Sequence, residues 1–158
     1  MPITKRRLRH SILGSLAALV ALAGIDAVEA ADEAANVIKY RQTIMQSHGA
    51  HLRPIAMVIK GEVSYTGHIA AHARAAHAVS LMLEDVFPEG TDRGDTRAKP
   101  EIWQDKAKFE VAVKALQTAT GELVSLAESG DLAAVGAQLQ KVGQACGGCH
   151  KPFRKKKE

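Results

Sequence analysis

The chain has 158 residues, a formal net charge of +4, and a composition that is 46% hydrophobic but only 4% aromatic. This length suffices for one domain with its own core. Ala, Leu and Val dominate the apolar content, which favours helices over a β-sandwich. Removing the four basic and two acidic residues of the first thirty leaves a charge near +2. That bias is too weak to predict nucleic-acid binding.

The first thirty residues have the pattern of a signal peptide. A basic stretch ends at Arg9, an uncharged apolar run extends from Ile12 to Ala23, and Val28-Glu29-Ala30 offers small residues to a signal peptidase. The apolar run is shorter than the ~20 residues of a membrane span, although an uncleaved anchor stays an alternative. We therefore expect residues 1–30 to be removed on export to the periplasm and residues 31–158 to form a soluble, mature domain.

The mature part begins with two predicted helices. Apolar residues recur at helical spacing over residues 33–60, with Gly61 as a stop and Pro54 as a point where the helix should kink or divide. The second helix is predicted over residues 67–85. Its buried stripe should comprise Ile69, Ala73, Ala76, Ser80 and Leu83.

Two further helices follow a loop over residues 87–99, which is rich in Gly, Pro and Asp and too polar to be core. The third helix is predicted to begin near Pro100 and to end at Gly130, and Asp131 should cap the fourth. The fourth helix should bury one stripe: Leu132, Val135, Leu139, Val142, Cys146 and Cys149. No segment shows strand alternation. The sequence thus predicts an all-α fold, an antiparallel four-helix bundle.

The fourth helix ends in the motif Cys146-Gly147-Gly148-Cys149-His150, which has the CxxCH spacing of a covalent haem site. Residues i, i+3 and i+4 share one helix face. Two thiols can therefore reach one porphyrin edge while the imidazole turns under the iron. A zinc site would need further ligands, and the chain has no other cysteine. A Cys146–Cys149 disulfide would be a reactive redox pair. The motif behind an export signal favours one haem c.

The sequence resembles the class II cytochromes c, the cytochrome c prime family, over essentially all of residues 33–158. Members of that family are exported four-helix bundles with CxxCH close to the C-terminus. The resemblance rests on Tyr40-Arg41-Gln42, Lys60-Gly61-Glu62, Pro100-Glu101-Ile102-Trp103, Ser129-Gly130-Asp131 and the final CGGCHKPFRKKK.

The resemblance implies roles for five residues of this chain. His150 matches the proximal iron ligand, and Met45 falls at the family's distal position on the first helix. Arg41 matches a basic residue that typically meets a haem propionate. Arg154 matches a basic residue near the proximal side, and Phe153 stands where Tyr is common.

Met45 separates the two functions found in the family. One branch has a Met sulfur on the iron, is low-spin and transfers electrons; a thioether ligand raises the haem potential. The other branch leaves the iron five-coordinate and open to NO and CO. The residues around Met45 and in the loop look more like the low-spin branch. We therefore expect an electron carrier that turns over no substrate and meets redox partner proteins. Gas binding is the main alternative, and peroxidase-like chemistry is a third.

The remaining histidines are expected on solvated helix surfaces. His68 and His72 are four residues apart and could pair on a metal ion. His48 follows Met45 by three residues, which places it beside the predicted distal site. The family often forms homodimers through its first two helices. Small residues of the second helix would allow such an approach: Ala70, Ala71, Ala73, Ala75 and Ala76.

Overall fold

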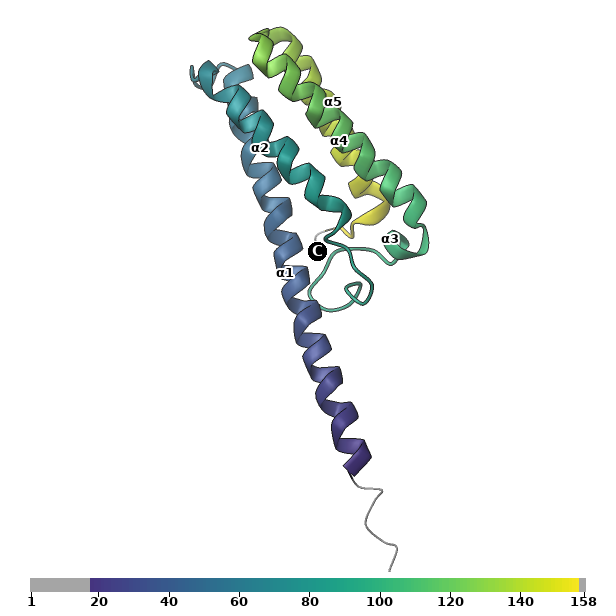
Figure 1. Ribbon diagram of the computed structural model, residues 1–158. Coiled ribbons are helices and arrows are strands. Elements are labelled where there is room, and N and C mark those ends of the chain that lie inside the picture. The colour runs from purple at the N-terminus through teal and green to yellow at the C-terminus, as the bar shows by residue number, and fades with distance from the viewer. Residues whose placement is uncertain (1–17, 157–158) are drawn as a thin grey trace, which may run out of the picture. The chain divides into compact units, whose positions relative to one another are not determined.

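The computed structural model describes the backbone of residues 18–156 and the side chains of residues 33–156. The chain divides into two compact units, residues 1–33 and residues 34–158. The predicted signal peptide, residues 1–30, lies largely outside the described residues. The second unit contains the helical bundle and the cysteines of the predicted haem site (Figure 1).

Helix α1 runs from Ala18 to Ile59 and enters the second unit at Ala34. It continues through Pro54 as one helix, so of the two effects expected there, a kink or a division, the division is wrong. The stop at Gly61 is confirmed. Gly61 has a φ of 73°, the N–H of Glu62 donates to the Met57 carbonyl at 2.9 Å, and the N–H of Gly61 donates to the Val58 carbonyl at 3.0 Å. This is the Schellman pattern, which satisfies the last carbonyls of a helix and favours glycine.

The second helical segment has three parts. Helix α2 runs from Ile69 to Leu81, between the short 3₁₀ helices η1 (Thr66–His68) and η2 (Met82–Glu84). The predicted stripe is confirmed, because all five of its members are buried. Ala73 and Ala76 are completely buried in the chain's own core. These two residues are therefore not available to a partner subunit.

The predicted third helix is two helices. Helix α3 spans Glu101–Gln104 and helix α4 spans Lys106–Ser129. Asp105 separates them with a non-helical backbone (φ −127°, ψ 62°), and its carboxylate accepts a hydrogen bond from the N–H of Lys108 at 3.2 Å. An aspartate that caps the following helix competes with continuation of the preceding one.

Helix α5 spans Leu132–Phe153 and begins as predicted. Gly130 ends α4 in the left-handed conformation, and the Asp131 carboxylate accepts from the N–H of Ala134 at 3.0 Å. Leu132 was expected in the buried stripe but is 42% exposed. Leu132 is the first residue of α5 and directly follows the turn formed by Gly130 and Asp131.

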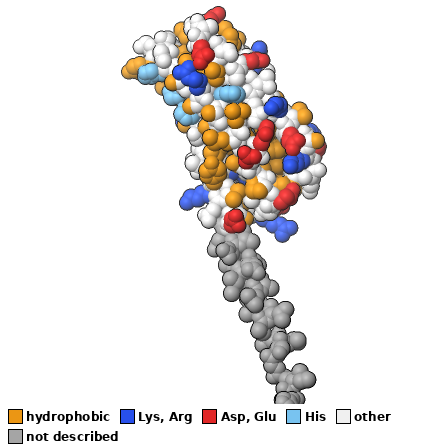
Figure 2. Space-filling model, in the orientation of Figure 1, with side chains coloured by type: hydrophobic (Ala, Val, Ile, Leu, Met, Phe, Trp, Pro, Cys, Tyr) orange, Lys and Arg blue, Asp and Glu red, His pale blue; other side chains and the backbone are white. Residues whose placement is uncertain are grey.

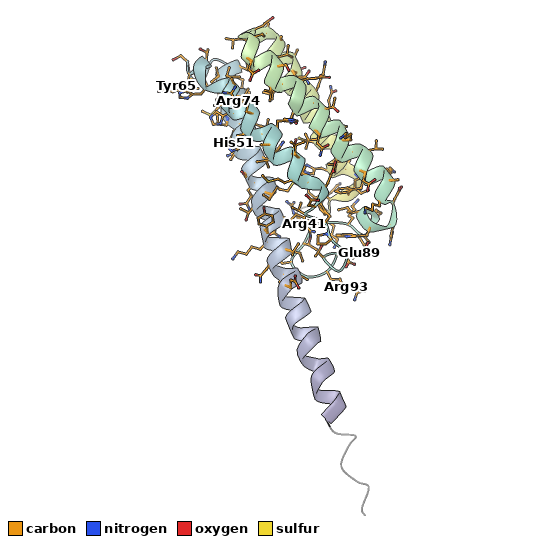
Figure 3. The ribbon with its side chains drawn as sticks, viewed as in Figure 1. Arg41, His51, Tyr65, Arg74, Glu89 and Arg93 are labelled. Carbon is orange, nitrogen blue, oxygen red and sulfur yellow. The ribbon has the colours of Figure 1, made fainter. Side chains whose placement is uncertain are left out.

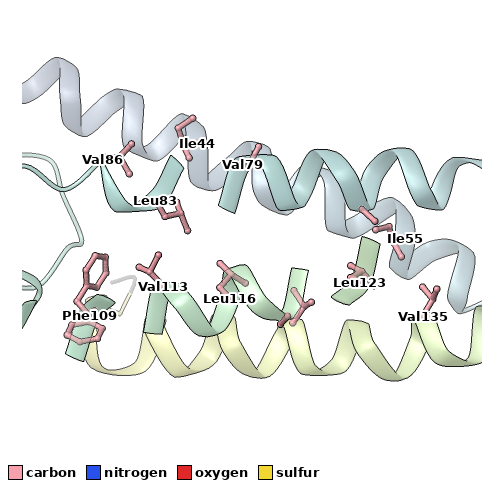
Figure 4. Packing of buried hydrophobic residues seen from close by; sticks show 14 of the residues in the cluster. Ile44, Ile55, Val79, Leu83, Val86, Phe109, Val113, Leu116, Leu123 and Val135 are labelled. Atoms are coloured by element: carbon pink, nitrogen blue, oxygen red, sulfur yellow. The ribbon is translucent and has the colours of Figure 1, made fainter. Parts of the chain in front are cut away.

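The core lies between α1 and α2 on one side and α4 and α5 on the other. Figure 4 shows Ile44, Ile55, Val79 and Leu83 facing Phe109, Val113, Leu116 and Leu123. Apolar residues at spacings of three and four, Phe109, Val113, Leu116 and Leu123, form much of the buried stripe of α4. Within the described residues all regular elements are helical, and the one isolated β-bridge joins Ala98 to Arg154. None of these helices combines the length and apolar character that a membrane crossing requires.

Candidate functional site

Cys146, Cys149 and His150 lie on the last turns of α5 and line one cavity of about 470 Å³. Both cysteines are free thiols and are half-buried. His150 is half-buried too. The cavity is of the size that holds small-molecule ligands and cofactors in proteins. A Cβ atom added at Gly147 or Gly148 would meet nothing within 4 Å. The protein's own packing therefore does not require these two helix-weakening glycines.

The protonation of these groups follows from their burial. Burial raises the pKa of the Cys149 thiol to about 11, with a further contribution from Cys146, and it raises the pKa of Cys146 as well. Reactive redox cysteines have lowered pKa values, so this pair is unlike a thiol–disulfide centre. Burial, followed by the charges of Arg154 and Arg97, lowers the pKa of His150. The imidazole is therefore held in the neutral form that binds metal ions.

The cavity wall is mostly apolar. Helices α1, α3, α4 and α5, the 3₁₀ helix η2 and the loop over residues 87–99 contribute to it. Besides Met45, its large aliphatic and aromatic side chains are Leu52, Leu83, Phe87, Ile102, Phe109, Leu116 and Phe153. Phe109 packs edge-on against Phe153 with ring centroids 5.3 Å apart and against Phe87 at 4.8 Å. These contacts fix one side of the cavity as a rigid aromatic wall.

Met45 and His48 line the same cavity from α1. Met45 is half-buried and packs against the core cluster. His48, one turn further along α1, is only 6% exposed, and its Nε2 has no hydrogen-bond partner among the described residues. Burial is the main cause that lowers the pKa of His48, and the nearby His51 and His150 add to it. The structure thus brings the predicted distal residue and the predicted proximal residue to one cavity.

Arg41 also lines the cavity, and Figure 3 shows it close to the loop that carries Glu89 and Arg93. Most of its donors are already used. Its Nη1 donates to the Thr91 hydroxyl at 3.0 Å and to the Val86 carbonyl at 3.3 Å. Its Nη2 donates to the Thr91 carbonyl at 3.0 Å and to the Thr96 hydroxyl at 2.9 Å. Within the described part of the chain this leaves the Nε–H for a further acceptor. Arg41 therefore anchors the loop over residues 87–99, a role that its sequence position did not indicate.

Two other arginines border the cavity. Arg154, predicted near the proximal side, follows α5 and is exposed. Arg97 comes from the loop, is also exposed, and was not among the predicted site residues. Its position depends on the pairing of the loop with the end of the chain, where the Lys155 N–H donates to the Arg97 carbonyl at 2.8 Å. No local sequence signal marks such a pairing.

The residues of this cavity fit a covalently bound haem. Two thiols and a neutral imidazole lie on one wall, aromatic and aliphatic side chains surround the interior, and Arg97 and Arg154 supply positive charge for carboxylate groups. The buried Nε2 of His48, which has no partner among the described residues, is a further sign that the cavity is completed by a ligand.

The prediction of solvated histidines holds for His68, which is exposed, and is wrong for His48, which is buried; His51, His72 and His77 are half-buried. His72 faces His51 of α1, with their Nδ1 atoms 3.3 Å apart, while His68 stacks on Tyr65 with ring centroids 5.3 Å apart. The alternative in which His68 pairs with His72 on a metal ion is therefore not formed. Figure 2 shows histidine side chains at the surface over the upper end of α2. Across the described residues, no three His, Cys, Asp or Glu side chains are grouped as a metal ion would need.

Comparison with known proteins identifies relatives along the whole second unit. The family model described as Cytochrome C' matches residues 36–154. The chain is 40% identical over 140 residues to a cytochrome c' from Rhodospirillum rubrum, a match that covers 88% of this chain and 95% of that protein. A crystal structure of cytochrome c' from Rubrivivax gelatinosus has a TM-score of 0.71 and 30% identity, and covers 75% of this chain and 94% of its own. A nitric oxide complex of a mutant cytochrome c prime from Alcaligenes xylosoxidans has a TM-score of 0.73 and 33% identity, and covers 78% and 97%.

Proposed function

The chain belongs to the cytochrome c′ family, and from this premise we propose that it is a periplasmic electron carrier whose haem iron is ligated by His150 and Met45. As a family member it is a four-helix bundle that binds one haem c covalently. The bound haem supplies the one-electron couple. The protein supplies attachment, ligands, a dry environment and charge.

Attachment is assigned to Cys146 and Cys149. Their i, i+3 spacing on α5 directs both sulfurs into the cavity, and His150 follows on the same face. The raised thiol pKa values mean that both sulfurs stay protonated at neutral pH in the chain without haem. The lowered pKa of His150 keeps a nitrogen lone pair available for the iron.

The observation that carries the electron-transfer proposal is the position of Met45. This side chain lines the cavity from α1 while His150 lines it from α5, so the two residues proposed to bind the iron come from different helices of the bundle. A thioether is a soft ligand that raises the haem potential. Two side chains held by separate helices would change position little when the haem is reduced, which is what fast electron transfer needs.

The surroundings support a carrier rather than an enzyme. The apolar wall excludes water from the haem, and Arg97 and Arg154 add positive charge that attracts carboxylates and acidic partner surfaces. Cleavage of a signal peptide within residues 1–30 would deliver the chain to the periplasm. Redox partner proteins and a homodimer belong to the same proposal.

A specific observation favours a second function, the binding of small gases. The structurally similar cytochrome c prime from Alcaligenes xylosoxidans is described as a nitric oxide complex. If Met45 of this chain only packs above the iron, the same cavity would admit NO or CO.

Absorption spectra of the holoprotein and of Met45→Leu test the proposal. Leu has a similar volume and no donor atom, so the core is preserved and the sixth ligand is removed. We expect a low-spin spectrum in the wild type, a high-spin spectrum in Met45→Leu, and slow or absent CO binding that becomes rapid in the variant. A high-spin wild type that binds CO as readily as the variant would contradict Met45 ligation and favour gas binding.

A further inference from the structure

His48 is a buried polar group that the bundle itself does not satisfy. It is only 6% exposed, and within the described residues its Nε2 has no hydrogen-bond partner. Buried polar atoms in folded proteins almost always have partners, and one without a partner carries the full cost of its desolvation. His77 shows the usual arrangement in this chain, with its Nδ1 3.0 Å from the Thr120 hydroxyl.

The surroundings of His48 indicate where a hydrogen-bond partner for its Nε2 would lie. The ring lines the cavity assigned to the haem, together with Met45 on its own helix and His150 on α5. His48 follows Met45 by three residues, which places the two side chains on neighbouring parts of one helix face. The partner of Nε2 is therefore expected on the Met45 side of the cavity rather than in the protein.

The ring is suited to donate a hydrogen bond there. Burial and the nearby His51 and His150 favour its neutral form, in which one ring nitrogen carries a proton and the other accepts. In haem proteins, hydrogen-bond donors on the distal side decide which small ligands bind well. A donor favours ligands that carry negative charge when bound.

We propose that His48 is a specificity-determining residue whose Nε2–H donates to a small, polar ligand on the Met45 side of the haem. Such ligands are diatomic molecules that become polarised on iron and small anions such as cyanide. This inference rests on the haem assignment in the proposed function; where Met45 ligates the iron, the small ligand binds only after it displaces Met45. It gives the cavity a selectivity that an entirely apolar distal wall would lack.

The test uses the ferrous CO complex of the holoprotein in a Met45→Leu background, which opens the sixth position whichever way Met45 behaves. The C–O stretching frequency is read by infrared spectroscopy, because an N–H donor near the bound oxygen lowers it. We expect the frequency to rise when His48→Leu is added and to return most of the way with His48→Gln, which keeps an N–H. Ferric cyanide affinity should fall by about tenfold in His48→Leu, which corresponds to about 1.4 kcal/mol.

His51→Leu is the matched control. His51 lies one turn further along α1, is not part of the cavity wall, and contacts His72. Its replacement should leave the C–O frequency unchanged. If Met45→Leu gives too little holoprotein, Met45→Ala serves as the background.

Equal C–O frequencies with and without His48 would overturn the proposal. So would a low-spin bis-imidazole spectrum in Met45→Leu, because His48 would then be an iron ligand rather than a donor. Failure of Met45 ligation appears separately, as a high-spin wild-type spectrum, and leaves this comparison intact.

Discussion

Two regions of the bundle treat buried polar groups in opposite ways. Between α2, α4 and α5 a polar seam, defined as His77, Ser80, Thr120 and Gln138, is completed by the protein. Ser80 and Thr120 hydroxyls are 3.0 Å apart, Ser80 donates to the His77 carbonyl at 2.7 Å, and Gln138 donates to the Ala119 carbonyl at 2.9 Å. In the cavity between α1 and α5, His48 Nε2 is left without a partner among the described residues.

The difference shows which part of the fold depends on a ligand. The polar seam holds three helices in register with bonds that need nothing from outside the chain. The cavity combines free thiols, a neutral imidazole and an unsatisfied ring nitrogen, for which bound haem or a ligand on it would supply the partners. Substitutions of these particular groups should therefore change the cofactor or its ligands first, and those in the seam should change stability first.

The largest expected effect is from the double substitution Cys146→Ser, Cys149→Ser. Without the sulfurs no thioether can form, so haem staining after denaturing electrophoresis should be lost and acid–acetone should extract any remaining colour. Gly143→Ser is the control. It adds a hydroxyl at an exposed position on the same helix, where a Cβ meets nothing within 4 Å. A stained band from the double variant would refute the attachment site.

Arg41→Met should have the next largest effect. It removes four hydrogen bonds and leaves the carbonyls of Val86 and Thr91 without their donors. We expect a loss of about 2–4 kcal/mol in the free energy of unfolding, measured by urea denaturation of the holoprotein. Gln42→Met is the matched control, because the neighbouring side chain makes one exposed bond to the Asp95 carbonyl and should cost less than about 0.5 kcal/mol. Equal losses in the two variants would show that the loop is not anchored through Arg41.

Thr120→Val should have the smallest effect and should act on stability alone. Valine keeps the shape of threonine but leaves the His77 ring and the Ser80 hydroxyl without one partner each, so we expect a loss of about 1–2 kcal/mol. The haem spectrum should stay that of the wild type. Thr118→Val, at an exposed position of the same helix, should change neither quantity. A changed spectrum in Thr120→Val would mean that the seam and the cavity are not independent.

The helices and the attachment motif could be predicted because their signals are local. Ile69, Ala73 and Ala76 follow the helical period, Gly61 and Gly130 adopt the positive φ that ends a helix, and CxxCH is contiguous. The break at Asp105 was missed, because a capping aspartate within a helical pattern is easily interpreted as an exposed helical residue.

The contacts of the loop could not be predicted. The loop over residues 87–99 is mostly polar, yet Thr91 is only 2% exposed and the Trp103 Nε1–H donates to the Phe87 carbonyl at 3.0 Å. The bond from Trp103 joins residues that are distant in sequence. The bonds of Arg41 and the contact of His51 with His72 do the same. Their partners are set by how the helices pack, which periodicity within one helix does not specify.

The pairing between the loop and the chain's end has a consequence for the order of folding. The Lys99 N–H donates to the Phe153 carbonyl at 3.0 Å, and Ala98 forms its bridge with Arg154. Residues more than fifty positions apart meet late, because closing a long segment loses chain entropy before any contact compensates for it. Cys146 and Cys149 lie just before this junction. On a newly synthesised chain their thiols should therefore be accessible while the helices are still assembling, before the junction closes.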